Sequence, residues 1–140
     1  MSALVEVRDL TIAYDSSDRS VFALDGAELT IEAGESVAIV GESGSGKSTL
    51  GTAIGRLLPP EARRLNGDLI YEGRSVFTAS DEEVRALRRN HLGFIFQSPM
   101  TALDPTMRVG RQVALAVGGR PGVPDIAALL ERYSESSGQL

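Results

Sequence analysis

The chain has 140 residues, a formal net charge of −5 and no cysteine. Its length fits one domain with a buried core, and its 42% hydrophobic and 24% charged residues are ordinary for a soluble globular protein. The negative charge argues against a general nucleic-acid binder, and the lack of cysteine excludes disulfides and thiolate metal sites. No run approaches the roughly eighteen apolar residues of a membrane span, and the first residues do not resemble a signal peptide, so we expect a cytoplasmic protein.

The first half of the chain predicts three strands followed by a helix. Residues 3–14 are largely apolar, and residues 27–32 alternate apolar and polar side chains as in a half-buried strand. Residues 36–40 form a short, nearly all-apolar run, which is typical of a strand buried on both faces. A glycine-rich loop follows at once, and residues 47–58 then predict a helix that ends at Pro59-Pro60.

The second half predicts shorter elements. Residues 69–71 lie between turn signals and predict a short strand, and residues 92–96 predict another. Ser80 and Glu83 have the spacing of a capping box, which predicts the start of a helix. Two further helices are expected, over residues 109–117 and 126–133.

The glycine-rich loop matches the pattern G-x-x-x-x-G-K-[ST] without a gap. Glycines let the backbone curl so that its amides point at phosphate oxygens, and the following helix adds its positive end to the same site. Lys47 would then reach the β- and γ-phosphates, Ser48 would place its hydroxyl on Mg²⁺, and Thr49 can bond the α-phosphate side. A glycine- and serine-rich linker could match by chance, but the buried run before the loop and the helix after it favour nucleotide binding. The predicted cofactor-binding residues of the loop are Gly41, Glu42, Ser43, Gly44, Ser45, Gly46, Lys47, Ser48 and Thr49.

Two runs of residues resemble one family. Residues 41–49 resemble the Walker A loop of ABC-transporter ATPases, and residues 93–105 resemble the Q-loop of that family. The run Phe96-Gln97-Ser98-Pro99-Met100-Thr101 is similar to the version in dipeptide and oligopeptide importers. The resemblance implies an α/β fold, with a partial P-loop NTPase core, an N-terminal antiparallel β-subdomain and the start of a helical subdomain. It places the nucleotide-binding core in residues 1–97, and the Q-loop continuation and partial helical subdomain, with a poorly ordered tail, in residues 98–140.

The resemblance also implies roles for two residues outside the loop. Tyr14 lies 27 residues before Gly41 (41 − 14), where the family has an aromatic residue that stacks on adenine. The alternative is a strand tyrosine that packs on the sheet. Gln97 stands where the family has a catalytic glutamine that touches Mg²⁺ and the attacking water. The alternative is a loop glutamine in solvent.

Other motifs of the family do not appear in the sequence. The acidic residues after Gln97 are Asp104, Asp125, Glu131 and Glu135. None of them belongs to an Asp-Glu pair that follows four apolar residues, as in a Walker B motif, and no histidine follows Gln97. Phosphoryl transfer to water needs metal and a group that positions the water, so ATP hydrolysis by this chain is left open.

The resemblance therefore implies the N-terminal part of an ATP-binding subunit of a peptide-type importer, with ATP and Mg²⁺ as cofactors. Its expected partners are a second ATPase subunit and transmembrane permease subunits, which would hold it on the inner face of the cell membrane. One alternative is a truncated nucleotide-binding remnant or regulatory module without transport activity. Another is a small-molecule kinase or GTPase, but the Asn/Thr-Lys-x-Asp motif of guanine binding does not occur.

Overall fold

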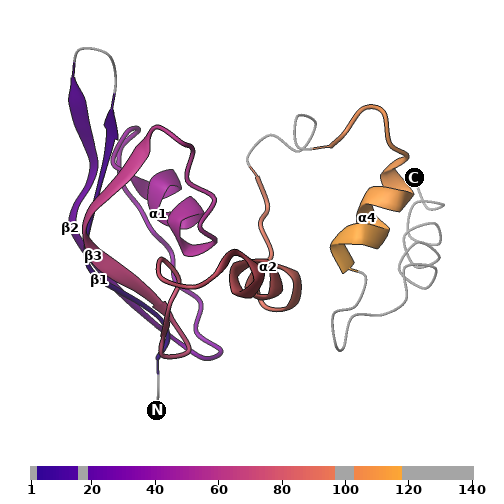
Figure 1. Ribbon diagram of the computed structural model, residues 1–140, viewed down its shortest axis with the longest axis horizontal. Helices are drawn as coiled ribbons and strands as arrows, with labels where there is room; N and C mark the ends of the chain where they lie inside the picture. The colour runs from indigo at the N-terminus through magenta and orange to yellow at the C-terminus, as the bar shows by residue number, and fades with distance from the viewer. Residues whose placement is uncertain (1–2, 16–18, 97–102, 118–140) are drawn as a thin grey trace. The chain divides into compact units, whose positions relative to one another are not determined.

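The computed structural model describes residues 3–15, 19–96 and 103–117, which fall into two compact units divided between Val84 and Arg85. The first unit contains a four-stranded sheet in the order β2-β1-β3-β4 and the helix α1 (Figure 1). The helix α2 runs across the division, and the second unit also contains α4. The elements are β1 (Ala3–Asp15), β2 (Ser20–Glu32), α1 (Lys47–Ile54), β3 (Ala62–Tyr71), β4 (Arg74–Ser75), α2 (Asp81–Asn90) and α4 (Val109–Val117).

The central strand β1 pairs antiparallel with both β2 and β3, and a bulge keeps its apolar residues on one face. Val7 and Leu10 are both buried, although regular alternation along a strand would put residues three apart on opposite faces. A bulge inserts one extra residue into a strand. Here the bulge lies at Asp9, which has a φ of 47° and stands where the register shifts in both pairings. The neighbouring strand carries Gly67 at this point, because a Cβ there would lie 2.1 Å from the Asp9 carbonyl oxygen.

The helix α1 lies on one side of this sheet (Figure 1) and ends sooner than the sequence predicts. Leu50 and Ala53 are its buried residues. The predicted end at residue 58 is wrong, because a Schellman motif closes the helix at Ile54. In this motif the Leu57 amide donates to the Thr52 carbonyl oxygen at 2.8 Å, while the preceding residue takes a left-handed conformation, with φ of 50°.

The helix α2 begins with the capping box that the sequence predicts. The Glu83 amide donates to Ser80 Oγ at 3.3 Å, and the Ser80 amide donates to Glu83 Oε2 at 2.8 Å. Val84 follows the box and is buried, with 3% of its surface exposed. Arg56 donates to the Ala79 carbonyl oxygen at 2.8 Å, which ties the end of α1 to the start of α2.

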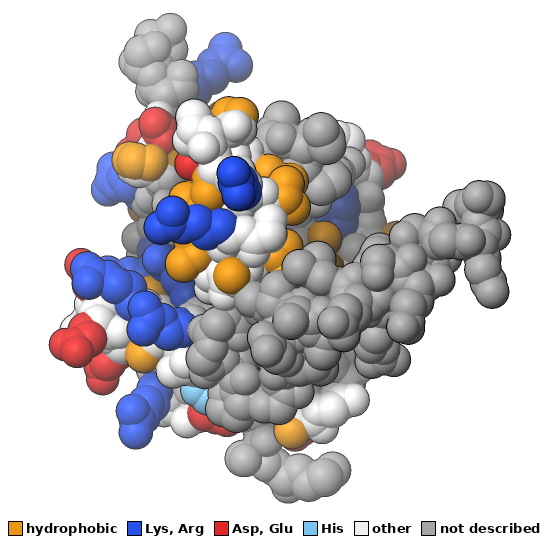
Figure 2. All heavy atoms as spheres, turned by 90° about the vertical axis from the view of Figure 1, so that its right-hand side faces the viewer, with side chains coloured by type: hydrophobic (Ala, Val, Ile, Leu, Met, Phe, Trp, Pro, Cys, Tyr) orange, Lys and Arg blue, Asp and Glu red, His pale blue; other side chains and the backbone are white. Residues whose placement is uncertain are grey.

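In the second unit, a side chain holds the loop before α4. Gln112 Nε2 donates to the carbonyl oxygens of Asp104 and Met107 at 2.9 and 2.8 Å, and its Oε1 accepts from the Asp104 amide. The helix over residues 109–117 is confirmed. It exposes the apolar residues Val109 and Leu115, and Figure 2 shows hydrophobic side chains next to Lys or Arg side chains on the face that carries it.

Two of the predicted strands are not formed. Residues 36–40 and 92–96 have no strand structure, and Val40 and Ile95 are almost fully exposed, at 92% and 101%. A strand buried on both faces needs neighbouring strands and covering helices, and the sheet of the described residues supplies neither to these segments. The predicted helix over residues 126–133 lies outside the described residues. Within the described ranges, no helix is long and apolar enough to cross a membrane.

Candidate functional site

The loop that carries the G-x-x-x-x-G-K-S pattern leads directly into α1, and strand β2 presses against its last glycine. Gly46 precedes α1 with a φ of 86°, a left-handed conformation that glycine adopts readily. A Cβ at this position would lie 2.2 Å from the Ala23 carbonyl oxygen and 2.8 Å from Leu24 Cδ2. The close approach of β2 therefore requires glycine here and fixes the curvature of the loop.

Lys47 folds back over the loop. Its Nζ donates to the carbonyl oxygens of Gly41 and Glu42, at 2.8 and 2.6 Å, and to Ser45 Oγ at 3.1 Å. A Cβ at Gly41 would lie 2.6 Å from Ser45 Oγ, so a larger residue would disturb the same loop. The ammonium group of Lys47 thus bonds residues near both ends of the loop.

The N-terminus of α1 has the features of an anion-binding site. The first amides of a helix have no intrahelical partner, and here no side chain caps them and no acidic residue lies in the first turn. Ser48 lies in this first turn and is exposed, while Ser43 and Gly44 are exposed in the loop. This arrangement fits phosphate groups, because amide donors, a helix end and one ammonium group meet around the same loop.

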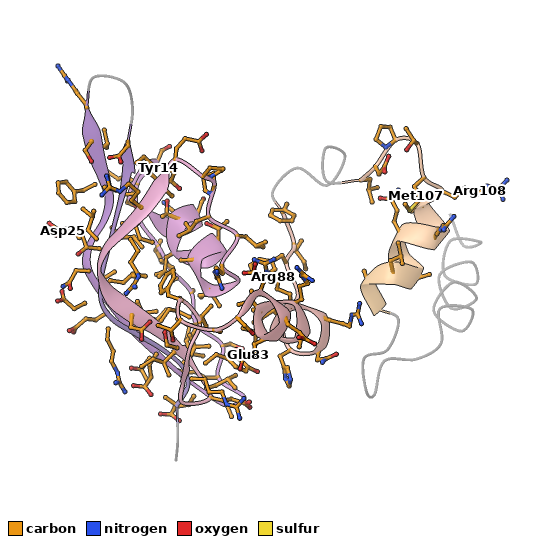
Figure 3. All side chains as sticks on the ribbon, in the orientation of Figure 1. Tyr14, Asp25, Glu83, Arg88, Met107 and Arg108 are labelled. Atoms are coloured by element: carbon orange, nitrogen blue, oxygen red, sulfur yellow. The ribbon has the colours of Figure 1, made fainter. Side chains whose placement is uncertain are left out.

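Beside the loop lies a cavity of about 270 Å³. Residues 44–49 form one part of its lining. Strands β1 and β2 form the rest, with Tyr14, Val21, Phe22 and Ala23. The Tyr14 hydroxyl lies 3.4 Å from Thr49 Oγ1, so the tyrosine reaches the start of α1 (Figure 3). The cavity therefore has a polar half suited to phosphate and a mainly apolar half suited to a planar ring.

The three cavity residues on β2 were missed in the sequence, because residues 15–20 predict a turn and the next strand was expected only at residue 27. In the structure β2 begins at Ser20, and Val21 pairs with Tyr14. The turn over residues 15–20 contains the signal for this pairing. Two antiparallel strands joined by a turn pair residues that lie at equal distances from the turn, here Tyr14 and Val21.

Polar contacts fix the strand ends next to Tyr14. The Asp15 carboxylate accepts from Arg63 at 2.8 Å and from Ser20 Oγ at 3.0 Å, so residues of β3 and β2 hold the end of β1. The hydrogen bond from Arg63 is the main cause that lowers the pKa of Asp15 below its ordinary value. The position of Tyr14 is thus set by both neighbouring strands.

The predicted metal ligands are only partly placed. Ser48 lies at the start of α1, next to the loop, whereas Gln97 lies outside the described residues and its predicted contacts stay predictions. Over residues 3–15, 19–96 and 103–117, no group of three or more His, Cys, Asp or Glu side chains could hold a metal ion. Of the two predicted ligands, the described residues therefore contain the Ser48 hydroxyl, an oxygen ligand that suits Mg²⁺ and leaves room for phosphate oxygens and water.

A model of the family described as ABC transporter matches residues 24–139. The chain belongs to the ABC transporter family. It is 41% identical to the oligopeptide transport ATP-binding protein OppD of Bacillus subtilis (strain 168), over 81% of this chain and 32% of that protein. It is 39% identical to the dipeptide transport ATP-binding protein DppD of Lactococcus lactis subsp. cremoris (strain MG1363), over 79% of this chain and 32% of that protein.

The chain spans about a third of the length of the curated ABC transporter proteins that it matches. Among solved structures it is similar to an ATP-binding cassette, whose structure is a dimer in a post-hydrolysis state bound to ADP and Pi. The TM-score is 0.73 at 29% identity, over 94% of this chain and 54% of that one. The predicted family and the predicted fold class, a partial P-loop NTPase with an antiparallel β-subdomain, are confirmed.

Proposed function

We propose that this chain binds ATP with Mg²⁺ through residues 41–49, as the N-terminal part of an ATPase subunit that energises the import of peptides or similar solutes. The observation that carries the proposal is the loop itself. Lys47, the uncapped start of α1 and the glycines at 41 and 46 meet around one cavity. The relatives named for oligopeptide and dipeptide transport support the kind of solute.

Each part of the cavity has a distinct task in this proposal. Lys47 exchanges its bonds to the loop carbonyls for bonds to the β- and γ-phosphates, which are stronger because both partners are charged. The amides at the start of α1 hold phosphate oxygens, and Tyr14 stacks on the base. Ser48, and Gln97 beyond the described residues, would hold Mg²⁺, which neutralises charge between the phosphates.

The relatives and the dimeric cassette support the partners of this proposal. A second ATPase subunit, the same or a related chain, and membrane-spanning permease subunits would complete the transporter. In that assembly the chain lies on the inner face of the cell membrane, attached through its partners. Other subunits of the transporter, rather than this chain, would select the solute.

The proposal is tested with Lys47→Ala and Mg-ATP in a calorimeter. We expect a loss of about 1.5–3 kcal/mol of binding free energy, the worth of a charge-assisted contact to phosphate. Arg8→Ala is the matched control, since it also removes one positive charge but its side chain is exposed and pairs with Glu6, outside the cavity lining. Equal affinity of wild type and Lys47→Ala would contradict the proposal.

A second measurement uses the composition of the chain. Lys47 is its only lysine, so an amine-reactive reagent can label only Lys47 and the N-terminal amine. Mg-ATP should protect Lys47 and leave the N-terminal amine reactive, which peptide mapping resolves. Labelling of Lys47 that ATP does not slow would argue against a phosphate contact by this side chain.

A further inference from the structure

We propose that Asn66 is a site of spontaneous deamidation, and that the bulge residue Asp9 controls the reaction by holding the side-chain amide of Asn66. When the bulge opens, Asn66 is converted to aspartate or isoaspartate, and the product then keeps the bulge from closing. The site lies on β1 and β3, outside the lining of the cavity, so the inference does not depend on the proposed function.

The order of two residues in the sequence makes the reaction possible. The chain contains two asparagines, Asn66, which is followed by Gly67, and Asn90, which is followed by His91. In deamidation, the backbone nitrogen after an asparagine attacks the carbonyl carbon of the asparagine side chain. Glycine after the asparagine favours this attack, because it has no Cβ to hinder it and its backbone is the most free to adopt the required conformation.

The reaction exchanges the amide nitrogen for an oxygen of water. The attacking nitrogen loses its proton to the solvent and forms a bond to the side-chain carbon, which closes a succinimide ring. The bond from this carbon to Nδ2 breaks, and Nδ2 takes up a proton from water and leaves as ammonia. A second water molecule then opens the ring at one of its two carbonyl groups. One opening gives aspartate, and the other gives isoaspartate, in which the backbone passes through the former side chain.

The bulge requires glycine at the position that favours deamidation. Gly67 has a φ of 77° and stands where the register of β1 and β3 shifts. A Cβ at this position would lie 2.1 Å from the Asp9 carbonyl oxygen and 2.4 Å from that of Arg8. The close approach of β1 therefore excludes a larger residue here, while the asparagine beside it is exposed to water.

Asp9 holds the reacting side chain away from its own backbone. Asn66 Nδ2 donates to Asp9 Oδ2 at 2.6 Å, a hydrogen bond that runs from β3 to β1. Because an ionised carboxylate only accepts hydrogen bonds, the nitrogen end of the amide must face Asp9. Closure of the succinimide requires the side chain to turn toward the Gly67 nitrogen, which breaks this bond. Hydrogen bonds to charged groups are among the stronger ones in proteins, so the closed bulge protects Asn66.

The products of the reaction cannot restore this bond. Aspartate at position 66 only accepts hydrogen bonds and carries a negative charge, so it repels the carboxylate of Asp9 where the amide attracted it. Isoaspartate lengthens the backbone of β3 beside Gly67, where the two strands already lie close together. Either product therefore keeps the bulge open, and one opening event leaves a permanent change.

The first test follows deamidation of the 140-residue chain at mildly alkaline pH by peptide mapping, in buffer and in urea. In urea, Asn66 should react faster than Asn90 and give both aspartate and isoaspartate. In the folded chain, Asn66 should react much more slowly. Asp9→Gly removes the acceptor, and glycine suits the φ of 47° at this position. This variant should deamidate about tenfold faster than folded wild type, because loss of a hydrogen bond to a charged group favours opening by about that factor.

Asp9→Asn is the matched variant. Asparagine tolerates a positive φ and keeps an acceptor oxygen but has no charge, so the rate should lie between those of wild type and Asp9→Gly. Circular dichroism shows whether each variant is folded, and Asn90 serves as a control within every chain. Should both variants unfold, the stability measurement below decides the question.

The second test measures the effect of the product by urea unfolding. Asn66→Asp places the second carboxylate opposite Asp9 and should lower the urea midpoint. The double variant Asp9→Asn/Asn66→Asp exchanges the amide and the carboxylate and has the same net charge as wild type. The hydrogen bond between the two positions can form again in it, so its midpoint should return most of the way to that of wild type.

Four results would overturn the inference. Asn66 could react in urea no faster than Asn90; folded wild type could deamidate as fast as the chain in urea; folded Asp9→Gly could deamidate no faster than wild type; or the double variant could be no more stable than Asn66→Asp. Failure of the proposed function changes none of these measurements, because no nucleotide takes part in them.

Discussion

At the scale of single residues, Gly46 links the two halves of the cavity. Its missing side chain lets the carbonyl oxygen of Ala23 approach the loop, and Ala23 belongs to the strand that carries Val21. In the sequence pattern, glycine at this position lets the backbone curl so that its amides point at phosphate oxygens. The structure adds a second reason, because the strand of the apolar half packs directly against the loop of the polar half.

Tyr14 is the residue whose predicted role a simple pair of variants can test. Tyr14→Ala should weaken ATP binding by roughly 1–3 kcal/mol, the worth of stacking one base on an aromatic ring. Tyr14→Phe should be nearly silent, because the hydroxyl lies 3.4 Å from Thr49 Oγ1, longer than an ordinary hydrogen bond between hydroxyl groups. Affinity and melting temperature are measured on both variants. If Tyr14→Ala lowers the melting temperature but leaves the affinity unchanged, the tyrosine only packs on the sheet.

At the scale of elements, the capping box of α2 predicts a dependence of stability on pH. The backbone amide of Ser80, and then its hydroxyl, donate to the Glu83 carboxylate and lower its pKa below the ordinary value of 4.5. A carboxyl group with a lowered pKa in the folded state stabilises the fold above its ordinary pKa. This contribution is lost as the pH falls through the lowered pKa.

The matched variant is Glu83→Gln, since glutamine can still accept the hydrogen bond of a capping box but does not titrate. Urea unfolding followed from pH 7 down through the acidic range should show wild type losing its advantage over Glu83→Gln as the pH falls. A constant difference between the two proteins at every pH would show that the carboxylate contributes nothing through its charge.

The elements also show which signals the sequence carries. The capping box and α4 depend on residues close together in the chain, and both were predicted. The strands predicted over residues 36–40 and 92–96 are not formed. An apolar run becomes a buried strand only beside neighbouring strands and covering helices, and the run itself does not specify them. The start of β2 at Ser20 was missed for a similar reason, since only its pairing with β1 makes the exposed Val21 and Phe22 part of a strand. The loop could be located from the sequence alone, because its pattern consists of neighbouring residues, and its binding of nucleotide stays a prediction.

At the scale of the whole molecule, we predict that the 140-residue chain binds ATP without turning it over at an ordinary enzymatic rate. No Asp-Glu pair in the sequence follows four apolar residues, as a Walker B pair does, so nothing evident anchors Mg²⁺ or positions the attacking water. General-base help alone is worth about 10²–10⁴-fold in rate. Steady-state phosphate release by the purified chain is the measurement, with Lys47→Ala as the background. Lys47-dependent turnover near the enzyme median of roughly 10 s⁻¹ would show that another acidic residue does this work.

The exposed run at residues 36–40 has a consequence for the chain in concentrated solution. It combines three large apolar residues with alanine and serine, contains no proline, and leaves Val37, Ile39 and Val40 open to solvent. Uncharged segments of this kind can pair with copies of themselves and seed aggregation. Here Glu35 and Glu42 flank the run as gatekeepers, since stacked copies would bring like charges together. Added salt therefore weakens the electrostatic barrier to aggregation, because it screens these charges.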